Sequence, residues 1–198
     1  MAISKQKKQA RKQKKQKEKA YGEKQKRANE KKKFREHVKA MMAKIITPEH
    51  ESYEILSKGC APYENYGDAK QHIEDMTEVL NTTRFGVGLA APQIGIQKRA
   101  LVWKKTPNSA IEYMINPVVL SSNDETQSMY EGCLSYPGWV AEIERPTEIE
   151  VSWYDLDATA HTSKFAGWQA RILLHEIDHL AGICKVGAAP EESRKYSK

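Results

Sequence analysis

The sequence predicts an α+β fold, in which antiparallel β-sheets pack around a central helix that carries the pattern His-Glu-x-x-His. One observation is a set of short segments, rich in β-branched and aromatic residues, that are separated by turn residues. A second is a helical pattern late in the chain, which contains the two histidines. Since no internal repeat is visible, we expect these strands and the helix to form one body.

Two segments of the body have the apolar spacing of a helix. The first spans residues 69–81, where apolar side chains recur every three or four residues. The second runs from about residue 168 to 180, and Gly182 lies near its expected C-terminal end. This second segment carries the histidine pattern.

The strands are expected on both sides of turn residues. Strands are predicted at 100–103 and 111–115, separated by the Pro-Asn-Ser sequence at 107–109. Residues 148–154 alternate between apolar and polar side chains, which is typical of a half-buried strand. Residues 161–165 are its expected hairpin partner.

Charge divides the chain into an arm and a body. Residues 1–39 hold 17 Lys or Arg and four Glu, a balance of +13, whereas residues 40–198 hold the other 15 Lys or Arg and 22 Asp or Glu, a balance of −7. We therefore expect a basic N-terminal arm followed by a mildly acidic body. The 198 residues are enough for one domain with a core.

The arm has the composition of a solvated segment. Residues 1–33 are mostly Lys, Gln, Glu, Ala and Arg, which favour helix by propensity but provide no apolar stripe to bury. It is expected to be either disordered or a solvated helix. Its charge suits RNA phosphate or simply solubility, whereas organelle targeting peptides are richer in Ser and poorer in acids.

The sequence points to the cytoplasm. No apolar run approaches the roughly 18 residues of a membrane span, and no apolar segment follows Met1 as in a secretory signal. The cysteines are odd in number and irregularly spaced, which favours a reducing compartment; they are Cys60, Cys133 and Cys184.

The histidine pattern predicts a metal site. His175 and His179 lie one helical turn apart and share a face, so that both imidazoles can bind one ion, and Glu176 beside them can act as a general base. The alternative is a helix with two solvated histidines. The apolar residues 170–174 argue against it, because they place this turn against a core where unpaired imidazoles are costly.

Two further segments are rich in small residues. Residues 86–93 hold two glycines and two alanines, which lets a backbone approach a ligand closely or form a tight turn before a strand. Residues 131–135 surround Cys133 with small residues. The other cysteines, Cys60 and Cys184, are expected to be small buried apolar residues.

Together, these three segments resemble the motifs of peptide deformylases, in the same order. Residues 86–93, 131–135 and 175–179 match GxGLAAxQ, EGCLS and HExDH. The resemblance covers roughly residues 45–183, which implies a catalytic domain there, between a basic arm at 1–44 and a short polar tail at 184–198. The compact form, without the usual C-terminal helix, is similar to phage-encoded deformylases. Flanking segments that also match are 116–117, 136–138 and 167–171.

The resemblance implies a metallohydrolase that removes the formyl group from the N-terminal methionine of nascent polypeptides and releases formate. Glu176 would be the general base and acid. The side-chain amide of Gln93 and the backbone N–H of Leu134 would stabilise the oxyanion. The ligands of one divalent ion, with a fourth position left for water, would be Cys133, His175 and His179.

This ligand set admits Fe(II), Zn, Ni or Co. The resemblance favours Fe(II), which is the ion we expect. The expected partners are formyl-methionyl nascent peptides and, through the basic arm, the RNA of the ribosome. The protein is expected to be a monomer in the cytoplasm of a bacterial or phage-infected bacterial cell.

The resemblance also implies how the peptide binds. The substrate would lie as a strand against Gly86, Val87 and Gly88 on one side and against Gly132 on the other. Its methionine side chain would enter an apolar pocket. The residues expected to line that pocket are Trp168, Arg171 through its aliphatic stem, and Ile172.

Three charged residues are expected to support the site, although Asp178 and Arg145 suit a solvent-exposed surface as well. Glu131 would pair with Arg145, and Asp178 would fix the helix or the tautomer of a ligand. Two departures from the family stand out. Val140 occupies a position where many members have arginine, and the segment 184–190, Cys-Lys-Val-Gly-Ala-Ala-Pro, replaces the usual apolar run.

Two other functions compete with deformylation. A zincin-type metalloprotease needs a third ligand after the second histidine, but no histidine follows His179, and Cys133 upstream answers the need better. An RNA-binding protein with a degenerate metal fold would have no need to keep Glu176 and Gln93. Both alternatives therefore explain fewer residues.

Overall fold

The computed structural model describes residues 2–196, so Met1 of the expected arm and residues 197–198 of the expected tail lie outside the described residues. The chain divides into two units between Ala40 and Met41. The first unit consists of helix α1 (Ala2–Met42), which continues two residues into the second. Its side chains at 22–37 are exposed, so this part of the arm has no buried face.

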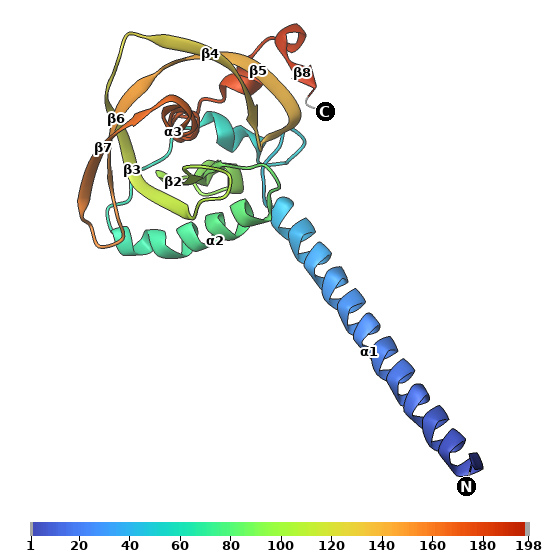
Figure 1. The fold of residues 1–198 in the computed structure, drawn as a ribbon. Helices are drawn as coiled ribbons and strands as arrows, with labels where there is room; N and C mark the ends of the chain where they lie inside the picture. Colours follow the sequence, from blue (N-terminus) through green and yellow to red (C-terminus); the bar gives the residue numbers. More distant parts are fainter. Residues whose placement is uncertain (1, 197–198) are drawn as a thin grey trace. The chain divides into compact units, whose positions relative to one another are not determined.

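The second unit has two long helices, and both were predicted. Helix α2 (Ala69–Thr82) buries one apolar stripe, which includes Ile73 and Met76. Helix α3 (Gly167–Leu180) carries the histidines and contacts strands of both sheets, so that it lies at the centre of the unit (Figure 1). Short 3-10 segments connect the unit at Tyr53–Ser57 (η1), Tyr66–Asp68 (η2) and Ala91–Ile94 (η3).

The larger sheet is antiparallel, with strand order β1-β2-β3-β6-β7. Its strands are β1 (Gly88–Ala90), β2 (Ala100–Lys104), β3 (Ile111–Ser122), β6 (Glu148–Tyr154) and β7 (Ala160–Ala166). The predicted hairpin is β6–β7. With α3 packed between this sheet and the smaller one, the α+β fold class is confirmed (Figure 1).

The smaller sheet holds β4 (Thr126–Cys133), β5 (Tyr136–Pro146) and β8 (Lys195–Tyr196), in that order. Neither β4 nor β5 was predicted. Most of β4 is exposed, and Thr126 is its only β-branched residue, so its composition gives little indication of a strand. The pairing with β5 stabilises it.

The segment expected to be a polar tail folds against the body. It forms α4 (Lys185–Ala188), the 3-10 turn η4 (Glu191–Ser193) and strand β8, which pairs with β5. Val186 is fully buried in an apolar cluster with Cys133, Tyr136 and Ile143. The folded body therefore extends to Tyr196. Within residues 2–196, none of the helices has the length and apolarity needed to cross a bilayer.

Candidate metal centre and substrate cleft

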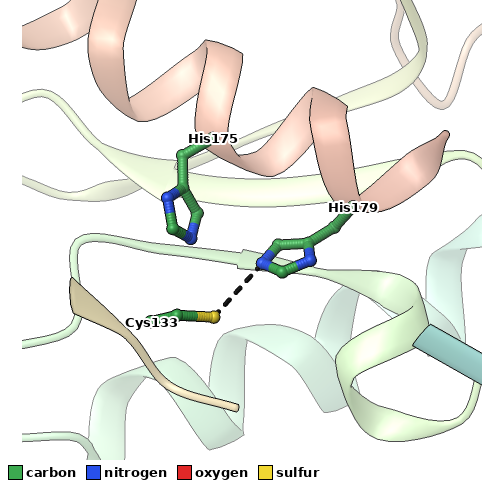
Figure 2. Close-up of side chains that lie close together, drawn as sticks. All are labelled: Cys133, His175 and His179. Atoms are coloured by element: carbon green, nitrogen blue, oxygen red, sulfur yellow. Dashed lines mark hydrogen bonds between the residues drawn. The ribbon is translucent and has the colours of Figure 1, made fainter. Parts of the chain in front are cut away.

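The structure brings Cys133, at the end of β4, to the two histidines of α3. Their ligand atoms all lie within 4.8 Å of one another. The Cys133 Sγ is 3.3 Å from the His179 Nε2, and Figure 2 shows both imidazoles extending from one side of α3 toward the cysteine. Three donors from two elements thus converge on one point.

The chemistry and burial of this cluster fit a divalent metal ion. One thiol and two imidazoles are a donor set that suits Fe(II), Zn, Ni or Co. The Glu176 Oε2 is buried beside them, and no described residue forms a hydrogen bond with it. A buried carboxylate without a partner is costly, and a bound cation nearby would offset that cost.

Glu131 on β4 fixes the orientation of His175. The His175 Nδ1 donates to one carboxylate oxygen at 2.9 Å, which leaves Nε2 free to bind a metal. Arg145 donates to both oxygens at 2.6 and 3.0 Å. Burial opposes ionisation of Glu131, but the hydrogen bonds from His175 and Arg145 prevail and lower its pKa to about 2.

Two contacts link Glu131 to α3. Glu131 accepts directly from His175, and Arg145, which is bound to Glu131, donates through its Nη1 to Asp178 at 2.8 Å. Of the two roles expected for Asp178, the geometry therefore supports anchoring of the helix. The expected pair of Glu131 and Arg145 is present.

Arg171 lines the cleft as expected, and its guanidinium makes contacts that were not expected. Its side chain lines the cleft, but the guanidinium is buried and donates to Glu131 at 2.7 Å. It also donates to the carbonyl oxygens of Ile143 and Gln127 at 2.9 and 2.5 Å. The charged group of Arg171 therefore joins α3 to the smaller sheet. The sequence alone did not indicate this contact, because Glu131 comes close to Arg171 only in the folded chain.

Gln93 is held so that its amide nitrogen faces the cysteine ligand. Its Oε1 accepts from the Ala90 N–H at 2.9 Å, which fixes the orientation of the amide. Its Nε2 donates to Ser135 Oγ at 3.2 Å and lies 3.6 Å from the Cys133 Sγ. Sequence reasoning did not single out Ser135, although it belongs to the same motif as Cys133. Leu134, between these two residues, lines the cleft.

The position of Gly88 has no room for a side chain, because the carboxyl group of Glu176, the candidate general base, packs against it. A Cβ atom at Gly88 would lie 2.3 Å from the Glu176 Oε1. Burial raises the pKa of Glu176 to about 7, and the charges of His175 and Arg145 only partly oppose this shift. The glycine thus gives Glu176 the space to lie beside the metal ligands.

A cavity of about 490 Å³ opens beside this cluster. All residues expected to bind the substrate line it, namely Gly86, Val87, Gly88, Gly132, Trp168, Arg171 and Ile172. Aromatic residues that sequence reasoning missed line it as well, namely Phe85, Tyr130, Tyr136 and Trp139. Since Trp168 and Tyr130 are each 46% exposed, the outer part of the cavity is an open cleft.

The cleft is bordered by one open edge of each sheet. Both β1 and β4 are edge strands. The Val87 carbonyl accepts from the Lys104 N–H at 2.8 Å, on the β2 side. Because antiparallel pairing alternates, the N–H and C=O of Gly88 point to the open edge instead. An extended peptide can therefore pair with β1 through Gly88.

The chain is similar to peptide deformylases along most of its length. A family model described as polypeptide deformylase matches residues 42–195, which includes the folded C-terminal segment. The chain is 39% identical over 141 residues to a peptide deformylase of Pelagibacter ubique, with 67% of this chain and 79% of that protein covered. It is 38% identical over 145 residues to one from Orientia tsutsugamushi, with 67% and 80% covered.

Solved structures give the same result. A peptide deformylase from Thermotoga maritima superposes with a TM-score of 0.66 at 33% identity, covering 72% of this chain and 94% of that one. A probable peptide deformylase from Synechococcus phage S-SSM7 superposes with a TM-score of 0.65 at 32% identity, covering 72% and 97%. The residues that the family model matches, 42–195, include α3 and the strands of both sheets as far as Lys195.

Proposed function

The chain belongs to the peptide deformylase family, metal-dependent hydrolases that remove the formyl group from nascent peptides, and we propose how its residues perform this reaction. One observation carries the proposal. Cys133, His175 and His179 converge within 4.8 Å, and Glu176 lies buried beside them without a hydrogen-bond partner in the described residues at its Oε2. The remaining residues of the cleft support this centre.

The metal would be held by Cys133 as thiolate and by the Nε2 atoms of both histidines. When bound, it polarises the formyl carbonyl and lowers the pKa of water. Fe(II) is the proposed native ion, and the same donors accept Zn, Ni or Co. Glu131 keeps the Nδ1 proton of His175 in place, so that its Nε2 remains a ligand.

Glu176 would accept a proton from the attacking water and deliver it to the departing amine. Its burial suits this task, because a raised pKa makes a carboxylate an effective base near neutral pH. The amide of Gln93 and the N–H of Leu134 would donate to the oxyanion that forms at the formyl carbon. Formate and a free N-terminal amine are the products.

The peptide would bind as a strand between the two open edges, with β1 pairing through Gly88 and β4 through Gly132. Its methionine side chain would enter the inner cavity beside Ile172 and the stem of Arg171. Trp168 would cover the outer part. The metal-binding residues thus face the formyl end of the bound strand.

The experiment that tests this mechanism compares Glu176→Gln with the wild type on a short formyl-methionyl peptide amide. We expect the variant to retain one metal ion per chain and to lose turnover by at least about a hundredfold, since an amide cannot accept the proton. Glu74→Gln, on the exposed side of α2, serves as the control. Near wild-type kcat in the Glu176 variant would overturn the assignment.

The location of the reaction is also a proposal. Nascent formyl-methionyl chains emerge where ribosomal RNA surrounds them, and residues 1–39 carry a balance of +13. We propose that the arm strengthens binding to the ribosome through RNA phosphates. The protein would act as a monomer in the cytoplasm of a bacterial or phage-infected bacterial cell.

A further inference from the structure

Two cations contact aromatic rings that line the cleft. The guanidinium of Arg84 is 4.9 Å from the centroid of Phe85, which is 80% exposed. The ammonium of Lys195 is 4.3 Å from the centroid of Tyr130 and donates to its hydroxyl. Arg84, Phe85 and Tyr130 all line the cleft. We call these two contacts the rim pairs.

The second rim pair exists because the C-terminal strand β8 pairs with β5 and brings Lys195 to Tyr130. In the register of the smaller sheet, Lys195 of β8 lies opposite Val140 of β5, and Val140 lies opposite Gly132 of β4. Side chains of directly opposed residues project to the same face. The side chains of Lys195 and Val140 therefore lie on the same face of the sheet as Tyr130, and both Val140 and Tyr130 line the cleft.

The acids near the cleft leave Arg84 uncompensated and offset the charge of Lys195 only in part. Only two carboxylates line the cleft, and both are buried. Glu131 is occupied by arginines and by His175, and Glu176 lies at the reaction centre. Glu142, exposed on β5 and directly opposite Tyr130, attracts Lys195 and offsets part of its charge. The described cleft lining thus has no exposed carboxylate, although residues 40–198 carry a balance of −7.

We propose that Arg84 and Lys195 determine specificity by favouring formyl-methionyl peptides with an acidic side chain at the second or third residue. The inference rests on the proposed function and adds the substrate class. A strand advances about 3.3 Å per residue, so these residues pass the outer cleft once methionine fills the inner cavity. Contact with the aromatic rings holds both cations in place, and their positive charge remains available to a carboxylate of the substrate.

The test compares formyl-Met peptide amides that carry Glu, Gln or Lys at the second residue, and a second series with the same changes at the third. Amides remove the terminal carboxylate, which would otherwise bind the same cations. In at least one series, we expect kcat/KM to fall in the order Glu, Gln, Lys, by roughly two- to fivefold for each exposed ion pair. The difference should shrink at 0.5 M salt, where charges are screened beyond roughly 4 Å.

Variants assign the preference to the rim pairs. Arg84→Gln and Lys195→Gln should each reduce the Glu-to-Gln ratio of kcat/KM, and the double variant should bring it to about one. Lys164→Gln, which removes an exposed cation of β7 outside the cleft lining, should leave the ratio as in the wild type.

Two results would overturn the inference. One is equal kcat/KM for all three peptides of both series at low salt, and the other is an undiminished Glu preference in the double variant. Failure of the proposed function is distinguishable, because it would appear as no formate release from any of the peptides.

Discussion

At the scale of single residues, the site depends on close packing between the general base and a glycine. Gly88 lies in β1, the edge strand of the larger sheet, and Glu176 fills the space that a side chain at this position would occupy. The same glycine therefore serves two purposes. It admits the carboxylate, and its N–H and C=O remain at the open edge for a peptide.

Gly88→Ala tests this packing. The added Cβ would lie 2.3 Å from the Glu176 Oε1, so Glu176 must move away from the metal ligands. We expect kcat to fall by about a hundredfold, since a displacement of about 1 Å at a catalytic group can have that effect. The control is Gly59→Ala, because no atom lies within 4 Å of a Cβ at that position. Unchanged kcat in the Gly88 variant would contradict the packing argument.

Glu131 is the second residue on which the site depends. It accepts hydrogen bonds from His175, Arg145 and Arg171 while it is itself buried. Its removal would leave two arginines short of a counter-charge in the interior, and breaking a buried pair is strongly destabilising. Glu131→Gln keeps the shape of the side chain and removes only the charge.

We expect Glu131→Gln to lower the free energy of unfolding by about 3 kcal/mol. Because the amide holds His175 less firmly, metal affinity should fall by roughly ten- to a hundredfold. Denaturant unfolding and metal titration measure the two effects. Glu74→Gln on α2 is the exposed control. A variant with wild-type stability and metal affinity would show that Glu131 does not fix the ligand.

At the scale of elements, the C-terminal segment supports the strand that carries the cysteine ligand. Helix α4 and strand β8 pack against β5, and β5 in turn pairs with β4. Val186 lies in the same apolar cluster as Cys133. The segment therefore stabilises the strand that carries Cys133, a role that its largely polar sequence did not indicate.

Val186→Ala tests whether the segment is part of the fold. The change removes two buried carbon atoms, and we expect a loss of about 2 kcal/mol in the free energy of unfolding. Ile183→Ala, at a side chain that is 46% exposed, should cost less than about 1 kcal/mol. Equal, small effects in both variants would indicate a loosely attached tail.

At the scale of the whole molecule, charge is separated along the chain. The arm at 1–39 carries a balance of +13 and the remainder a balance of −7. The arm has no counterpart in the matched family region, which begins at residue 42. Its exposed helical side chains at 22–37 are accessible to a polyanion, in keeping with a role in localisation instead of chemistry.

Deletion of residues 1–39 should weaken co-sedimentation with ribosomes and leave turnover of a short formyl-methionyl peptide nearly unchanged. Binding of the full-length chain should fall steeply between low and moderate salt, as counterion release requires. An arm of equal length with every Lys of residues 1–39 replaced by Gln is the matched control and should behave like the deletion. Salt-insensitive sedimentation, equal in all three proteins, would reduce the arm to a solubilising segment.

The sequence by itself determined the elements whose pattern is local. Helix α2, the β6–β7 hairpin and helix α3 have apolar periodicity that the fold preserves, because each buries the stripe that its own residues define. The spacing of His175 and His179 likewise follows from one helical turn. Motif resemblance predicted the approach of Cys133, which spacing alone could not have done.

Only the tertiary structure decided which distant groups share the cleft. The four hydrogen bonds from Arg145 and Arg171 to Glu131 and Asp178 join positions 14 to 40 residues apart, and no local pattern specifies such pairs. Strands β4 and β8 could not be predicted from their amino-acid composition, because they are stabilised by pairing with β5 and not by intrinsic strand propensity. The position of Lys195 beside Tyr130 follows from that pairing, because register across a sheet is a property of the folded chain.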